Sequence, residues 1–180
     1  MASTGSDFRE DFSEASLKSH TVTYRVVAVA GIAVAAILFR VYVPRWISYL
    51  AYLELPLLVT IYFSLMRRSP LAGVCYGACI GLAQDSLSPD PLGMFGIVKT
   101  LVGYFAATVG QRFNVDNTGV RFTLSFFFYF FHQFFYWVLA RALLAQMIGF
   151  DLPTTLIVAV LNALVAVPLF RVLDKLKVTE

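Results

Sequence analysis

Long apolar runs separated by short polar turns dominate the sequence after residue 21. The runs cover residues 22–43, 46–66, 71–87, 92–110, 122–148 and 153–173. Most are close in length to the ~20 residues that a helix needs to cross a hydrocarbon core, and the run at 71–87 is the shortest. The pattern predicts six transmembrane helices in a single domain, residues 22–175, preceded by a polar cytoplasmic tail, residues 1–21.

Composition supports an all-α integral membrane protein that lies in the lipid bilayer. Hydrophobic residues make up 59% of the chain, the mean hydropathy is +0.75, and only 14% of residues are charged. Soluble domains carry roughly 25% charged residues. The net charge of +3 is small, so we expect no nucleic-acid partner.

Basic residues near the ends of the runs predict the orientation. Lysine and arginine are enriched in cytoplasmic loops. Such residues lie before or at the start of the first run, between the second and third runs, and after the last run: Lys18, Arg25, Arg67, Arg68, Lys175 and Lys177. An even number of crossings therefore places both termini in the cytoplasm and the polar turn at 85–90 outside. Arg45 departs from this pattern.

Three glycines recur at every fourth position of the short third run. Gly73, Gly77 and Gly81 lie on one face of a helix and let another backbone approach closely. We therefore expect this helix to be central in the bundle rather than lipid-facing. Cys75 and Cys79, one turn apart on the same run, are too unfavourably placed for a disulfide and are interpreted as small packing residues.

Charged residues lie within the runs or at their ends, which is costly in a bilayer. They are Arg40, Glu54, Asp85, Lys99 and Arg141. At ~1.5 Å rise per residue, Glu54 would lie about 12 Å below the outer start of its run, and all five fall in the outer half. They form either one charge network, in which Glu54 and Asp85 balance the cations, or separate cations that extend to the headgroups.

Other polar residues of the runs predict structural roles. His132 and Gln133, and Asn162 on the last run, suit hydrogen bonds between helices better than a metal site. Asp174 is interpreted as part of an ordinary solvated helix end. The sequence contains no nucleophile elbow, zinc-protease motif or phosphate-binding loop. We expect no catalytic residue, cofactor or metal ligand.

A polar turn separates the third and fourth runs. It reads Gly-Leu-Ala-Gln-Asp85-Ser-Leu-Ser88-Pro-Asp-Pro91-Leu-Gly93, and the next run ends near Gly103-Tyr104. Prolines lack an N–H, and an acid can bond nearby backbone, so Asp85, Ser88, Pro91 and Gly93 predict a structural turn. The segment resembles the signature of the rod shape-determining protein MreD family. Lys99 departs from that family's usual uncharged residue.

The resemblance implies a non-catalytic component of the bacterial inner membrane. Such a protein would bind MreC, act with MreB, RodA and a transpeptidase penicillin-binding protein, and help maintain cell shape and lateral peptidoglycan synthesis. The resemblance also implies a fold similar to the six-helix substrate-binding subunits of energy-coupling-factor vitamin transporters. A substrate-binding membrane subunit of a vitamin-type transporter is therefore the alternative function.

Overall fold

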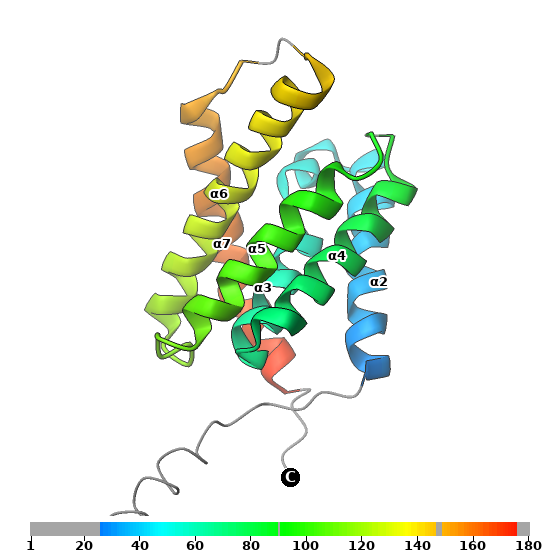
Figure 1. Cartoon of the computed structure of the whole chain (residues 1–180). Coiled ribbons are helices and arrows are strands. Elements are labelled where there is room, and N and C mark those ends of the chain that lie inside the picture. The colour runs from blue at the N-terminus through cyan, green and yellow to red at the C-terminus, as the bar shows by residue number, and fades with distance from the viewer. Residues whose placement is uncertain (1–25, 90, 147–148, 176–180) are drawn as a thin grey trace, which may run out of the picture.

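The computed structural model of the chain describes residues 26–89, 91–146 and 149–175 (Figure 1). The predicted polar tail, residues 1–21, and the orientation signals Lys18, Arg25 and Lys177 lie outside the described residues. The described chain is helical, which confirms the all-α fold with six helices. These are α2 (Val26–Tyr42), α3 (Leu55–Arg67), α4 (Pro70–Leu87), α5 (Met94–Gly110), α6 (Thr118–Leu144) and α7 (Leu152–Asp174).

Successive helices run in opposite directions, so the start of α2 and the end of α7 lie at the same end of the bundle (Figure 1). We call this the terminal end; it also holds the loop at 111–117. The distal end holds the described residues of the links between helices: 43–54, 88–89, 91–93, 145–146 and 149–151. By length and composition, four segments can cross a membrane: Val27–Arg45, Tyr49–Arg67, Thr118–Leu144 and Leu152–Asp174. The arrangement is that of a membrane bundle.

The second run is not one continuous helix, contrary to the prediction for residues 46–66. The chain forms short 3-10 turns η1 (Val43–Arg45) and η2 (Ser48–Tyr52), extends at Leu53, and starts α3 only at Leu55. Pro56 explains this start, because proline lacks an N–H and fits the first helical turn but not a helix interior. The α-helical rise assumed for the depth of Glu54 does not apply, because residues 46–54 are not α-helical and Glu54 lies just ahead of α3.

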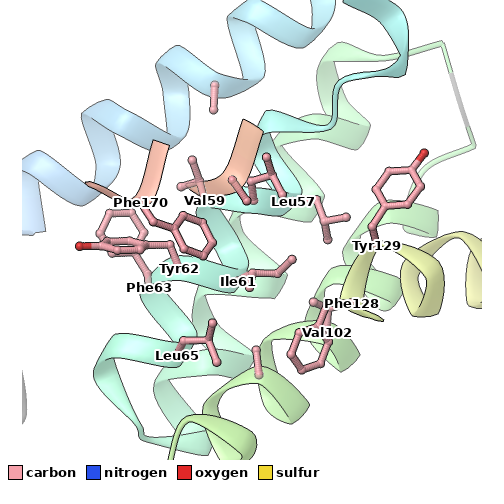
Figure 2. Packing of buried hydrophobic residues seen from close by; sticks show 14 of the residues in the cluster. Leu57, Val59, Ile61, Tyr62, Phe63, Leu65, Val102, Phe128, Tyr129 and Phe170 are labelled. Atoms are coloured by element: carbon pink, nitrogen blue, oxygen red, sulfur yellow. The ribbon is translucent and has the colours of Figure 1, made fainter. Parts of the chain in front are cut away.

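Helix α3, and not α4, is the centre of the bundle. Every residue from Pro56 to Met66 is buried, and large side chains of α3 pack against Phe128 of α6 and Phe170 of α7 (Figure 2). Helix α4 buries mainly its glycine face, whereas Leu71 is 75% exposed. A glycine stripe brings one face close to a neighbour, but bulky apolar residues on all sides are what require a central position.

The glycine stripe of α4 lies directly against the backbone of α5. A Cβ atom added at Gly73, Gly77 or Gly81 would collide with a carbonyl group of α5. The carbonyls belong to Gly103, Lys99 and Phe95, in the same order. This is the close helix packing that the four-residue spacing predicts.

The outward faces of α4 and α6 are apolar. Cys75 and Cys79 are free and exposed on α4, so their interpretation as packing residues was wrong. On α6, Phe127 is 52% exposed and Phe134 is 40% exposed. These exposed aromatic side chains give α6 an apolar outer face.

Side chains ahead of α6 and α7 satisfy the first N–H groups of these helices, which lack partners in the helix itself. Asn117 accepts from the N–H of Gly119 at 2.8 Å. Asp151 accepts from the N–H and the hydroxyl of Thr154. These hydrogen bonds from Thr154 hold the pKa of Asp151 below its usual range.

Candidate functional site

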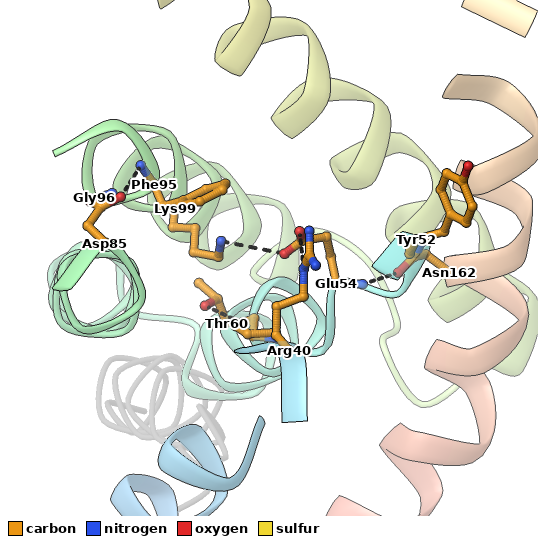
Figure 3. A network of polar contacts seen from close by, with 10 residues as sticks. Arg40, Tyr52, Glu54, Thr60, Asp85, Phe95, Gly96, Lys99 and Asn162 are labelled. Carbon is orange, nitrogen blue, oxygen red and sulfur yellow. Dashed lines mark hydrogen bonds and ion pairs between the residues drawn. The ribbon is translucent and has the colours of Figure 1, made fainter. Parts of the chain in front are cut away.

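Asp85 joins the end of α4 to the start of α5. Its side chain is buried, and its Oδ2 accepts from the backbone N–H groups of Gly93 at 3.0 Å and Gly96 at 2.9 Å. Its Oδ1 accepts from the N–H of Phe95 at 3.0 Å (Figure 3). A helix N-terminus offers unpaired N–H groups and favours a negative charge. The carboxylate therefore fixes the two helices relative to each other.

The other predicted turn residues shape the backbone between these helices. The N–H of Ser88 donates to the carbonyl of Gln84 at 2.9 Å and ends α4, and the carbonyl of Pro91 accepts from Met94 at 3.4 Å. Gly93 has a φ of 95°, a left-handed conformation that glycine adopts without strain. Asp85 thus bonds Gly93 directly, whereas Ser88 and Pro91 lie between them in the turn and bond neighbouring backbone groups.

A buried acid lies between two cations near the distal end. Glu54 Oε1 accepts from Arg40 Nε at 2.8 Å, and Glu54 Oε2 lies 3.9 Å from Lys99 Nζ (Figure 3). Lys99 is fully buried, and its Nζ lies 4.4 Å from the centroid of the Phe95 ring. We call Arg40, Glu54 and Lys99 the distal charge cluster. It brings together α2, the link ahead of α3, and α5.

The structure places the other two members of the predicted network elsewhere. Both carboxylate oxygens of Asp85 accept from backbone N–H groups at the start of α5, so Asp85 does not balance a cation as predicted. Glu54 is the acid beside Lys99. Arg141 is exposed near the end of α6, with its guanidinium 5.7 Å from the Trp137 ring centroid. Neither Asp85 nor Arg141 forms an ion pair with another described residue.

Asn162 of α7 holds the link that carries Glu54. Its Oδ1 accepts from the backbone N–H of Glu54 at 2.9 Å. Its Nδ2 donates to the carbonyls of Tyr52 at 2.8 Å and Val158 at 3.0 Å. Asn162 therefore has the bonding role between segments that its position in an apolar run predicts.

His132 does not have the hydrogen-bonding role predicted for it. The buried ring stacks on Phe95 with centroids 6.0 Å apart and an interplanar angle of 3°. Neither ring nitrogen has a hydrogen-bond partner within the described chain. Gln133, the next residue, lines a small cavity of about 230 Å³ between α6 and α7. Among the residues described, no group of three metal-ligating side chains could hold an ion.

The helix pattern and the Asp85 turn agree with a comparison to known families. The family model described as "rod shape-determining protein MreD" matches residues 20–176. The chain belongs to the MreD family. It is therefore a rod-shape-determining membrane component. Searches of curated proteins and of solved structures found no match, so the similarity to transporter subunits stays a prediction.

This MreD-family protein has a second polar cluster at the terminal end, which the sequence did not reveal. Asp174 Oδ1 accepts from the Tyr62 hydroxyl at 2.8 Å, and its Oδ2 lies 2.5 Å from Arg121 Nη1. Arg121 Nε also donates to the carbonyl of Val115 at 2.6 Å. The prediction of Asp174 as an ordinary solvated helix end was wrong. Its partners are 53 and 112 residues away, and no local pattern indicates them.

Proposed function

We propose that this chain is a non-catalytic inner-membrane component of the complex that elongates rod-shaped cells. In that complex it binds MreC and helps maintain lateral peptidoglycan synthesis, together with MreB, RodA and a transpeptidase penicillin-binding protein. Membership of the MreD family supports the role in cell shape. The partners are part of the proposal.

The observation that supports a scaffold role most directly is that Asp85 bonds the backbone at the start of α5. This buried carboxylate accepts three backbone N–H bonds in the segment that resembles the family signature. An acid or base in catalysis needs access to a substrate proton, whereas these bonds use Asp85 to fix α4 on α5. A helix pair with a fixed geometry suits a protein that presents a constant surface to a partner.

The charge distribution supports an orientation with both termini in the cytoplasm. The terminal end carries most of the described basic residues outside the helix interiors, and such residues are enriched on the cytoplasmic side. They are Arg67, Arg68, Arg112, Arg121, Arg171 and Lys175. The distal end would then face the periplasm.

Complementation combined with a pull-down tests this function. Cells depleted of their own copy should recover rod shape with the parent chain, and tagged MreC should retain that chain in mild detergent. Asp85→Ala should lose both properties. Ser86→Ala is the matched control, because Ser86 is exposed and bonds only the carbonyl of Leu82 among the described residues.

Two outcomes would contradict the proposal. If depleted cells stay rod-shaped, the proposed role in cell shape is wrong. If tagged MreC does not retain the parent chain, the proposed binding of MreC is wrong. Loss of uptake of a vitamin, with rod shape preserved, would instead support the transporter subunit.

A further inference from the structure

A cavity of about 620 Å³ opens at the distal end between α2, η1 and the end of α4. Its walls include two arginines, Arg40 and Arg45, and the buried amide of Gln84, with Phe95 of α5 at one side. Neither the turn nor the distal charge cluster accounts for Arg45 and Gln84. The cavity is large enough for a small polar group.

The charge of the walls favours an anion. Among the described residues that line this cavity, none is an aspartate or a glutamate. Among the described residues, the side chain of Arg40 forms its hydrogen bond through Nε, to Glu54, so its two terminal Nη atoms can serve another acceptor. Arg45 is exposed and belongs to the wall. Paired guanidinium groups are suited to phosphate oxygens.

The buried side chain of Gln84 adds a second requirement for a ligand of this cavity. The residue is only 2% exposed, and its Oε1 has no hydrogen-bond partner among the described residues. A buried acceptor without a donor is costly and needs an explanation. A ligand hydroxyl that donates to Oε1 would remove that cost. The cavity therefore suits a ligand that has both a negative charge and a hydroxyl group.

We propose that this cavity binds a phosphate ester with a free hydroxyl. Arg40 and Arg45 hold the phosphate oxygens, and Gln84 Oε1 accepts from the hydroxyl. The headgroup of phosphatidylglycerol has this chemistry, and the cavity lies at the end of membrane helices, where headgroups are found. Glycerol 3-phosphate offers the same groups from solution. The proposal does not depend on the partners proposed above.

Binding to the purified, delipidated full-length chain in detergent tests the site. The measurements are native mass spectrometry and the shift in melting temperature. The probes are phosphatidylglycerol, phosphatidylmethanol, which keeps the charge but lacks the hydroxyl, and phosphatidylcholine, which has no net charge. Phosphatidylglycerol should bind most tightly and phosphatidylcholine least. Equal binding of all three lipids would overturn the proposal.

Arg45→Gln isolates the charge. It should weaken phosphatidylglycerol binding about tenfold, the loss expected for one charge-assisted hydrogen bond. Arg141→Gln is the matched control, because Arg141 is an exposed arginine near the same end but lies outside this cavity. The same loss in both variants would mean that the lipid binds by general surface charge, and the proposed site would be wrong.

Gln84→Met isolates the hydroxyl. It keeps the size of the side chain and removes the unpaired oxygen, so folding should be retained and the preference for phosphatidylglycerol over phosphatidylmethanol should vanish. A preference that survives this substitution would overturn the role of Gln84. Glycerol 3-phosphate distinguishes a soluble ligand from a lipid. If millimolar glycerol 3-phosphate raises the melting temperature of the parent but not of Arg45→Gln, the ligand is soluble. If it does not raise the melting temperature while phosphatidylglycerol binds, the ligand is the lipid.

Discussion

The backbone N–H of Glu54 donates to Asn162 Oδ1 at 2.9 Å, across 108 residues of sequence. The same side chain donates to the carbonyl of Tyr52, so one residue of α7 fixes the non-helical link ahead of α3. This link positions the carboxylate of Glu54 between Arg40 and Lys99. Asn162 therefore supports the distal charge cluster without touching its charges.

Replacement of Asn162 should weaken the bundle. Asn162→Leu has a similar volume but leaves the N–H of Glu54 and the carbonyl of Tyr52 without their partner. Unpaired buried groups of this kind cost roughly 1–3 kcal/mol each, so the free energy of unfolding should fall by about 2–6 kcal/mol. Denaturation in mixed micelles measures it. The control is Leu161→Ala, on the exposed face of α7. Equal stability of Asn162→Leu and the parent would contradict the supporting role.

The distal charge cluster predicts an asymmetry between its acid and its buried lysine. Glu54→Gln removes the acid that Arg40 and Lys99 share, whereas Lys99→Met leaves the 2.8 Å pair of Arg40 and Glu54 in place. Breaking a buried ion pair costs about 3–5 kcal/mol. Accumulation in the membrane and thermal stability should therefore fall further for Glu54→Gln.

Exchange of the two residues tests the pairing itself. The double variant Glu54→Lys with Lys99→Glu should recover part of the stability that each of its single changes loses. A double variant no more stable than either single variant would contradict a pairing strong enough to offset the loss of the Arg40–Glu54 contact.

The turn and the glycine stripe were predictable because their chemistry is local. Asp85 lies eight residues from Gly93, within one turn, and the four-residue spacing of Gly73, Gly77 and Gly81 defines a helix face without any knowledge of the neighbour. The break ahead of α3 also had a local signal in Pro56. Hydropathy averaged over a window missed it, because the residues of the link are apolar.

The partners of the buried polar residues were not predictable. Asn162 bonds a link that precedes it by more than a hundred residues, and Asp174 meets Tyr62 across 112 residues. Such contacts depend on how the six helices are arranged, which hydropathy does not specify. The five-residue network failed in part for the same reason. The sequence predicted that the charges lie in one half of the bilayer, but it could not distinguish Asp85, which bonds backbone N–H groups, from Glu54, which bonds cations.

Topology gives a further prediction. With Cys75 and Cys79 replaced by serine, which their exposed positions permit, a cysteine at position 88 should react with an impermeant maleimide from outside the cell. A cysteine at position 112, at the terminal end, should react only after the membrane is permeabilised. The reverse labelling pattern would overturn the proposed orientation.

The glycine stripe predicts an effect that depends on position. Gly77→Ala places a methyl group against the carbonyl of Lys99, so α4 and α5 must separate, and accumulation should fall strongly. Gly31→Ala is the matched control: Gly31 also lies inside a helix, but nothing lies within 4 Å of an added Cβ. That change should be neutral or stabilise by roughly 0.5–1 kcal/mol. Immunoblots of membrane fractions measure both, and equal levels would show that α4 and α5 tolerate separation.

The turn at Asp85 gives the last prediction, in two variants. Asp85→Ala removes the acceptor of three backbone N–H groups, and hydrogen bonds to a charged group contribute about 1.5–3 kcal/mol each. Insertion should remain, because losing a charge favours partitioning into the membrane. Thermal stability and retention by MreC should both fall. A variant that matches the parent in both would remove the structural role of Asp85.

Asp85→Asn separates the charge from the geometry. An amide oxygen in the place of Oδ2 can still accept from Gly93 and Gly96, but the amide nitrogen would then face the N–H of Phe95, donor against donor. We therefore expect a stability between those of the parent and Asp85→Ala, measured by the same thermal melts. Full stability of Asp85→Asn would mean that the bonds to Gly93 and Gly96 suffice without the charge. Stability as low as that of Asp85→Ala would mean that α5 requires the negative charge at its N-terminus.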